Sequence, residues 1–382
     1  MANLPVFWEF GKYATALIMI TALIRRGNTK IPTLPLLYFV LLLPACLVTL
    51  TLYDWQYARQ MLSANMSGPL ALFVSCWFFS HLRVDWAQVK TLFFTAILPL
   101  LTVAVTTLFY TVTTADIQFN TESNHATSGG FGPNQVSAML GLGAFLCISA
   151  YLLFKNRFQD NLYLGVLTVF FAAQSVMTFS RGGMYNAVGA ALAVVLFQVQ
   201  NVGQGIKRLL PIAGLAAIFL LLVFPYLNEF TGGKLLERFE DREATNRYEL
   251  VESDLQIFSE NPIFGVGVGE SAVERTKVFG AEVASHTEFA RIVSEHGLFG
   301  CFALLALGLT LVFNITRQSS GEGKAMVAGM FVWSGIFMLN AGMRLAAPAF
   351  ILGLSFITIT QLPLIKKRFP KSKPTSVKKR YE

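Results

Sequence analysis

Long apolar runs, each close to 20 residues, recur along almost the whole of this 382-residue chain. A helix of about 20 residues crosses a hydrocarbon core about 30 Å thick, whereas barrel strands show an alternation over about ten residues that is absent here. The composition agrees, because 54% of the residues are hydrophobic and only 14% are charged. These features predict an all-α membrane protein, a polytopic bundle of about 11 transmembrane helices within a range of about 10 to 12.

The apolar runs divide the chain into candidate spans separated by polar loops. Eleven spans are predicted, at 4–24, 31–53, 67–82, 89–110, 133–154, 162–179, 184–200, 209–230, 297–315, 325–343 and 345–364. The first carries Glu9 and Lys12 and is followed by no small-residue cleavage site, so we interpret it as a retained helix and not a signal peptide. The four cysteines lie within apolar runs and are expected to be small core residues: Cys46, Cys76, Cys147 and Cys301.

The distribution of cations predicts the orientation, because short loops rich in Lys and Arg stay in the cytoplasm. The cations fall in alternate loops, at Arg25, Arg26, Lys30, Arg83, Lys90, Lys155, Arg157, Lys207, Arg208, Arg317 and Lys324. The N terminus is therefore expected outside and the C terminus in the cytoplasm. Residues 365–382 form a basic cytoplasmic tail, either in contact with anionic lipids or acting only as a topology anchor. The net charge of +8 thus reflects topology and not binding of nucleic acid.

A large polar segment stands apart from the spans on the outer side. Residues 231–296 contain 13 acidic and seven basic residues, too polar for lipid and too long for a simple connection. We expect an extracytoplasmic (periplasmic) loop that is partly helical. Tyr248, Val251, Leu255 and Phe258 recur at helical spacing, which predicts an amphipathic helix against the bundle or the membrane surface. The expected divisions are 1–230 (helices 1–8, with an outer loop at 111–132), 231–296, 297–364 (helices 9–11) and 365–382.

The stretch "ASHTEFARIVSEHGLFG", at 284–300, concentrates rare polar residues before an apolar run. Ser285 and Glu288 match the capping box S-x-x-E of a helix start. This places His286 at the first helical position, where the helix dipole favours a neutral imidazole that can accept a proton. An ordinary surface histidine at a helix cap is the alternative.

The rest of that stretch predicts the helix which follows. Glu288, Arg291 and Glu295 share one helix face, and we expect a charge-paired, exposed stripe. Gly297, with Gly300, allows a bend where the helix enters the membrane, and His296 is interpreted as an interfacial packing residue.

Arginines in apolar surroundings are further candidates for a site. In "TFSRGG", Arg181 lies between two apolar runs with no loop to solvate its charge. An intramembrane cation costs about 2.5 to 3.5 kcal/mol on insertion scales, so Arg181 is expected to face a polar cavity or to extend to the lipid headgroups. Its guanidinium group suits a phosphate or carboxylate ligand. Arg344, in "NAGMRLAAP", has the same placement, and Arg247 opens the amphipathic stretch.

Several common sites are excluded by their missing signatures. The glycines at 265, 267 and 269 do not fit G-x-G-x-x-G, because position 270 is Glu. No H-E-x-x-H, G-x-S-x-G or D-x-D occurs, which removes the simple signatures of a zinc protease, a serine hydrolase and a metal-dependent nucleotide-sugar transferase. No cofactor and no bound metal are expected.

Four motifs, taken in order, resemble the O-antigen ligase and polymerase superfamily of bacterial envelope proteins. They are "GFGPNQ", "TFSRGG", "NRYELVESDLQIFSENPIFGVGVG" and "HTEFARIVSEHGLFG", and they cover roughly 130–300. The family's histidine is commonly followed by Asn or Ser, whereas Thr287 follows it here.

This resemblance implies glycan transfer at the outer face of the bacterial inner membrane, from an undecaprenyl-diphosphate carrier to an acceptor hydroxyl. It further implies that Arg181 and Arg247 bind the diphosphate, and that His286 takes the acceptor's proton as the anomeric carbon is attacked with inversion. Asn134 and Glu295 match recurrent motif positions and are assigned supporting roles, as are Arg291 and Arg344.

The expected function is an O-antigen ligase with lipid A core as acceptor. A repeat-unit polymerase and a protein O-oligosaccharyltransferase are alternatives, because the visible motifs concern the donor. From other classes, a transporter or flippase for polyprenyl-linked glycan would use Arg181 and Arg344 along its path, and a non-catalytic envelope scaffold would need neither arginine.

Overall fold

The protein is described from a computed structural model that covers residues 10–27, 30–198, 202–241, 247–280, 283, 285, 287–340, 342 and 345–360, with the backbone alone at 202–205 and 247. Helices account for almost all of the regular structure. The α-helices are α1 (Phe10–Arg26), α2 (Thr33–Leu41), α3 (Leu43–Leu52), α4 (Trp55–Ser80), α5 (Trp86–Thr113), α6 (Pro133–Leu153), α7 (Phe158–Met177), α8 (Gly182–Gln198), α9 (Val202–Ile218), α10 (Phe224–Phe230), α11 (Lys234–Glu240), α12 (Arg247–Glu260), α13 (Ser271–Glu274), α14 (Thr276–Phe279), α15 (Glu288–Arg317), α16 (Gly321–Phe337) and α17 (Ala346–Leu354). A π-helical segment, η2 (Phe219–Val223), joins α9 to α10, and the short 3-10 helices are η1 (Ala126–Ser128) and η3 (Met338–Asn340).

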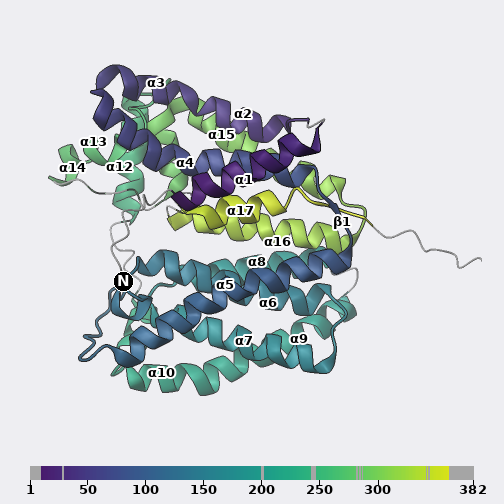
Figure 1. Ribbon diagram of the computed structural model, residues 1–382. Helices are drawn as coiled ribbons and strands as arrows, with labels where there is room; N and C mark the ends of the chain where they lie inside the picture. The colour runs from purple at the N-terminus through teal and green to yellow at the C-terminus, as the bar shows by residue number, and fades with distance from the viewer. Residues whose placement is uncertain are drawn as a thin grey trace, which may run out of the picture.

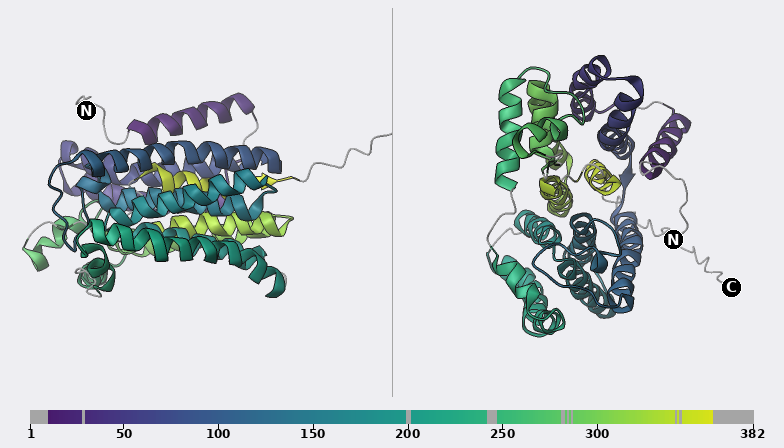
Figure 2. Two further views of the ribbon diagram at one scale, coloured as in Figure 1. Left: turned by 90° about the horizontal axis from the view of Figure 1, so that it is seen from below. Right: turned by 90° about the vertical axis from the view of Figure 1, so that its left-hand side faces the viewer.

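The long helices run side by side in one bundle (Figure 1). Seen along the bundle, α5 to α10 form one group, and α1 to α4 with α15 to α17 form the other (Figure 2). The two groups meet mainly where α16 packs along α8. The shorter helices α12 to α14 lie at one end of the bundle, opposite the end that carries the strand β1 (Figure 1).

The close contact between α6 and α8 depends on small residues. A Cβ atom added to Gly183 would lie 1.9 Å from the Ser137 carbonyl O, and one added to Gly141 would lie 2.1 Å from the Gly183 carbonyl O. Interfaces between membrane helices favour such residues, because they let the two backbones approach. The contact fixes the start of α8, just after Arg181.

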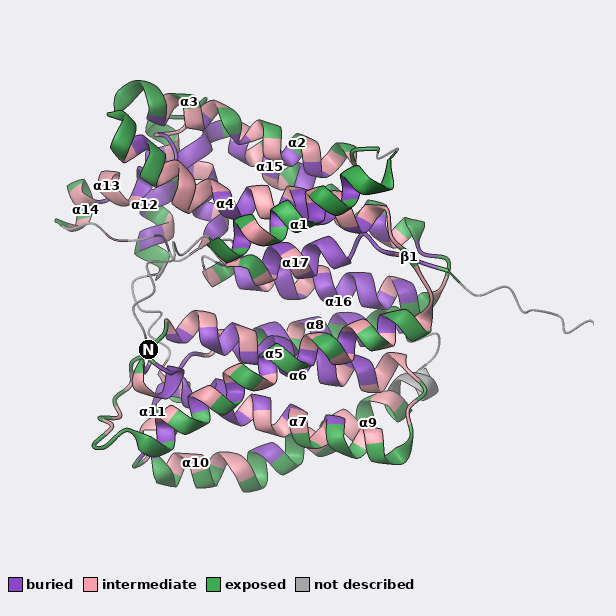
Figure 3. Ribbon diagram, in the orientation of Figure 1, coloured by how far each residue is buried: buried purple, intermediate pink, exposed green. Residues whose placement is uncertain are grey.

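A helix occupies each of the eleven predicted spans. Of the residues that the structure describes, six helical stretches are long and apolar enough to cross a membrane: Thr33–Leu52, Trp55–Ser80, Trp86–Thr113, Pro133–Leu153, Ile206–Phe230 and Glu288–Arg317. Their outward faces expose apolar side chains while buried residues line the contacts between helices (Figure 3). The chain is therefore an all-α membrane protein, and the count of eleven spans stays a prediction.

Two predicted span boundaries are wrong. The third helix begins at Trp55 and not at 67, because the Asp54 side chain accepts from the backbone N of Gln56 at 2.9 Å and caps α4 there. The last helix ends at Leu354, and the chain continues into β2 (Thr358–Ile359), which pairs in parallel with β1 (Arg83–Val84). Residues 361–364 of the predicted span lie outside the described residues.

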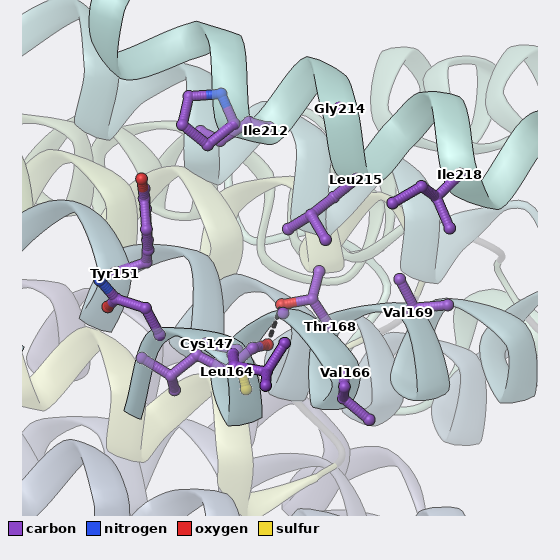
Figure 4. A pocket seen from close by; sticks show the side chains of 14 residues that line it. Cys147, Tyr151, Leu164, Val166, Thr168, Val169, Ile212, Gly214, Leu215 and Ile218 are labelled. Atoms are coloured by element: carbon purple, nitrogen blue, oxygen red, sulfur yellow. Dashed lines mark hydrogen bonds between the residues drawn. The ribbon is translucent and has the colours of Figure 1, made fainter. Parts of the chain in front are cut away.

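The expectation for the cysteines is confirmed in part. Cys76 and Cys147 are buried, whereas Cys46 and Cys301 are only half-buried. Cys147 lines an apolar cavity of about 500 Å³ between α6, α7 and α9, where Thr168 Oγ1 donates to the Leu164 carbonyl O at 2.7 Å (Figure 4). None of the predicted site residues lines this cavity.

Candidate functional site

Two groups of described site residues are bonded to short segments at one end of the bundle, Arg181 to the residue after α11 and Glu295 to Ser271 of α13 (Figure 1 and Figure 3). Asn134 belongs to the first turn of α6, Arg181 precedes α8, and Arg291 and Glu295 lie in the first half of α15. The starts of α6 and α8 meet because α7 runs antiparallel to both, so that the end of α7 returns the chain to the start of α6, where Ser180 bonds to Asn134.

The turn between α7 and α8 is held by α6. Phe179 has a φ of 59°, a left-handed conformation that residues other than glycine rarely adopt. Ser180 Oγ donates to Asn134 Oδ1 at 2.7 Å, and the Ser137 hydroxyl donates to the Ser180 carbonyl O at 2.9 Å. Asn134 therefore fixes the residue next to Arg181, and its supporting role stays a prediction.

Arg181 and α11 are joined directly. Its Nη1 donates to the Asp241 carbonyl O at 2.7 Å, at the C-terminal end of α11, where helix carbonyls carry partial negative charge. Arg238 of α11 is buried, and its Nε donates to the Phe179 carbonyl O at 3.1 Å. Arg181 is thus bonded to the protein, and Arg238 is a second arginine in this cluster. The sequence held no signal for Arg238, since it lies in an ordinary charged helix.

The predicted start of α15 is wrong. The N-cap is Thr287, whose Oγ1 accepts from the Ala290 backbone N at 3.2 Å, and the helix begins at Glu288. Ser285 does not form the capping box, because its hydroxyl donates to the buried Asp254 carboxylate at 2.9 Å. His286 lies outside the described residues.

The acidic and basic stripe of α15 is paired as predicted, but its predicted exposure is wrong. The exposed fractions of Glu288, Arg291 and Glu295 are 0%, 2% and 1%. Arg291 forms ion pairs with both carboxylates, with 2.6 Å between its Nη1 and Glu295 Oε2. Arg291 Nη1 also donates to Asn65 Oδ1 of α4 at 3.3 Å. Ser271 Oγ of α13 donates to Glu295 Oε1 at 2.9 Å. Pairing with Arg291 and these hydrogen bonds offset part of the cost of burial, although one guanidinium balances only one of the two carboxylate charges.

The predicted bend at Gly297 is confirmed. Gly297 has φ 61° and ψ −143°, which interrupts the helix. The freed carbonyls of Ser294 and Glu295 accept instead from the backbone N–H groups of Val266 and Gly267, at 3.2 and 3.1 Å. His296, beside the break, is buried, with its Nδ1 3.1 Å from the Leu42 carbonyl O.

The glycine-rich "NPIFGVGVG" stretch packs its backbone against this break, where side chains would not fit at Gly265. The Leu298 backbone N donates to the Pro262 carbonyl O at 2.8 Å, so the stretch bonds to both sides of Gly297. A Cβ added to Gly265 would lie 2.3 Å from the Glu295 carbonyl O. Its role is therefore structural, and the rejection of a dinucleotide motif agrees with that role.

The helix predicted within the large polar segment is confirmed as α12, but its packing face differs. Leu250, Asp254 and Ile257 are buried, whereas Tyr248 and Leu255 are 80% and 53% exposed. The face of α12 that packs against α15 includes Asp254. This buried carboxylate forms an ion pair with Arg275. Contact of the exposed apolar side with a membrane surface stays a prediction.

Three proposed residues are not tested by the geometry. His286 and Arg344 lie outside the described residues, and Arg247 is described by its backbone alone, as the first residue of α12. Five residues lie between Asp241 and Arg247, so six steps of about 3.5 Å allow the two α-carbons to be at most about 21 Å apart. The proximity of Arg247 to the Arg181 cluster therefore stays a prediction.

The fold is that of a polytopic helical membrane protein, and the described candidate site residues lie near helix ends. Residues 166–305 match the family model described as O-antigen ligase. The match includes the turn of Arg181, α12 and the broken start of α15, and it supports the resemblance of this segment to the O-antigen ligase and polymerase superfamily. A role in glycan transfer at the bacterial inner membrane follows from this family. No curated protein matches the chain.

Proposed function

We propose that this protein transfers a glycan from an undecaprenyl-diphosphate carrier to an acceptor hydroxyl at the outer face of the inner membrane. The proposed type is an O-antigen ligase with lipid A core as acceptor. The observation that carries the proposal is the turn of Arg181, which is fixed by α6 and α11 inside the segment that matches the O-antigen ligase family. A polymerase or a protein O-oligosaccharyltransferase would use the same donor chemistry.

The proposed reaction is a displacement at the anomeric carbon. The acceptor oxygen forms the new C–O bond, its proton goes to His286, and the bond to the diphosphate breaks with its electron pair on the leaving phosphate oxygen. Arg181 and Arg247 stabilise the charge that develops there. A guanidinium group has five N–H donors, and the bond to Asp241 uses one of those of Arg181. Attack opposite the leaving group inverts the anomeric centre and needs no bound metal.

The hydrocarbon chain of the donor requires an apolar space that is open to the bilayer. A cavity of about 650 Å³ lies among α1, α4, α5, α6 and α17, and its lining is mostly apolar. Met139 and Leu142 of α6 line it, one to two turns along the helix from Asn134. This placement supports a lipid-linked donor whose diphosphate lies near Arg181.

The decisive test is transfer in vitro with a defined undecaprenyl-diphosphate glycan and candidate acceptors, with release of the carrier as the readout. We expect His286→Ala to abolish release. The matched control is His125→Ala, since His125 is an exposed histidine in the segment between α5 and α6. Transfer by His286→Ala at the wild-type rate would exclude the assigned base, and the linkage of the product separates ligase from polymerase.

The same variants separate the other classes of function. A transporter would retain vesicle uptake of the lipid-linked glycan in His286→Ala and lose it in Arg181→Ala. A scaffold would keep its envelope phenotype after both arginines, Arg181 and Arg247, are replaced in an inserted protein.

A further inference from the structure

A buried ion pair lies directly behind the segment that leads into α15. Asp254 of α12 and Arg275, which follows α13, are paired through Oδ1 and Nη1, and their exposed fractions are 1% and 0%. Burial of two charges costs several kcal/mol per ion unless the pair is well bonded. The remaining hydrogen bonds of the two side chains therefore identify the backbone segment that the ion pair positions.

Those bonds go to both sides of position 286. Arg275 Nε donates to the Val283 carbonyl O at 2.7 Å, and Ser285 Oγ donates to Asp254 Oδ2 at 2.9 Å. The Ser285 hydroxyl is also 2.9 Å from the Thr287 carbonyl O, and Thr287 caps α15. The backbone is thus attached to the ion pair or its partners at residues 283, 285 and 287.

The ion pair is itself anchored to α15 beyond the segment. Ser294 Oγ donates to the same carboxylate, at 3.1 Å from Asp254 Oδ1, and Arg275 Nη2 donates to Ser271 Oγ at 3.4 Å. Ser271 in turn donates to Glu295. Burial raises the pKa of the Asp254 carboxyl, an effect that Arg275 and the two serine hydroxyls oppose.

We propose that Asp254 and Arg275 are positioning residues for glycan transfer, which hold residues 283, 285 and 287 on both sides of His286 and so help the proposed base to meet the acceptor hydroxyl. The inference rests on the proposed function, because it requires His286 as the base. A misplacement of about 1 Å costs a rate factor of about 100, so loss of one anchoring bond should act on kcat.

Two serines on the same carboxylate supply a matched test. Ser285→Ala removes the bond beside position 286, whereas Ser294→Ala removes the bond from within α15. We expect Ser285→Ala to lower kcat about tenfold or more, with the donor and acceptor KM within about twofold of wild type. Ser294→Ala should keep kcat within about twofold, and the two variants should have similar melting temperatures in detergent. Ser285→Thr, which keeps the hydroxyl, should recover most of kcat.

The charge is tested by Asp254→Asn, which we expect to lower kcat more than Ser285→Ala does. If this variant fails to fold, the serine pair still decides the question. Equal kcat values in Ser285→Ala and Ser294→Ala would overturn the inference, and so would a rise in donor KM without loss of kcat. If His286→Ala abolishes transfer while Ser285→Ala leaves it intact, positioning is wrong and the proposed function stands. Full transfer by His286→Ala removes the proposed function itself.

Discussion

Phe179 shows how much the site depends on single residues. Its left-handed backbone conformation costs roughly 1 to 3 kcal/mol, and the bond from Arg238 to its carbonyl helps to maintain the turn that presents Arg181. Arg238→Ala should therefore disturb donor binding. We expect a donor KM raised about tenfold, with the acceptor KM unchanged, in steady-state transfer assays. Lys234→Ala, which breaks an exposed ion pair on the same helix, is the control, and a raised acceptor KM in place of the donor effect would contradict the prediction.

Glu270 gives a prediction on pH at the same scale. Burial raises the pKa of this carboxyl, and hydrogen bonds from Tyr53 and Tyr57 oppose the rise. A carboxyl whose pKa is raised in the folded state contributes most stability below its unfolded pKa of about 4.3, and that contribution is lost as the pH rises through the folded pKa. Glu270→Gln should thus gain melting temperature relative to wild type between about pH 4 and pH 7. If the difference in melting temperature between Glu270→Gln and wild type stayed constant over this range, the titration of Glu270 would not be coupled to folding.

Ion pairs between residues close in sequence were predictable. Glu288, Arg291 and Glu295 follow helical spacing, so their mutual ion pairs could be inferred from the sequence. Their burial could not, because Asn65 and Ser271 cover them from distant parts of the chain. Ser285 failed as a helix cap for a similar reason, since its partner Asp254 lies 31 residues away.

Among the elements, α15 is the one whose geometry is most specific. Alanine at Gly297 would need a φ of 61°, and its Cβ would lie 2.6 Å from the Ile263 carbonyl O. We expect Gly297→Ala to destabilise the fold by about 2 kcal/mol or more and to reduce transfer, as measured by melting temperature and carrier release. The control is Gly308→Ala in the same helix, where the added Cβ meets no atom within 4 Å. Equal melting temperatures for the two variants would show that the break tolerates a side chain.

Element positions were more predictable than element ends. Apolar runs located the long helices, because lipid requires every backbone group to be bonded within the protein. The ends depended on caps and on partners remote in sequence, as at Asp54 for α4 and at β1 for the residues after α17. The face of α12 followed an ion pair that the hydrophobic pattern does not contain.

At the scale of the whole molecule, the orientation in the membrane is the main untested expectation. In a protein with its four cysteines replaced, Asn120→Cys should react with an impermeant thiol reagent in spheroplasts, because the 114–132 segment is expected outside. Lys155→Cys, in an expected cytoplasmic loop, should react only after lysis. Both positions are exposed, so accessibility to solvent does not bias the comparison. The reverse labelling pattern would invert the predicted topology.

The arrangement of the two helix groups lay beyond the sequence. Composition and run length predicted a bundle, whereas the packing of α16 along α8 depends on the complementary shapes of distant segments. The superfamily motifs nevertheless include the starts of α6 and α8, which the fold brings together.

The interrupted helix at Gly297 also constrains the order of synthesis. Val266 and Gly267, which bond to the Ser294 and Glu295 carbonyls, are made before α15 leaves the ribosome. With the predicted topology, they have to be translocated before the break forms, because the carbonyls of the buried residues Ser294 and Glu295 would otherwise lack these partners. A slow step in moving the 231–287 segment across the membrane would therefore delay the formation of the break in α15.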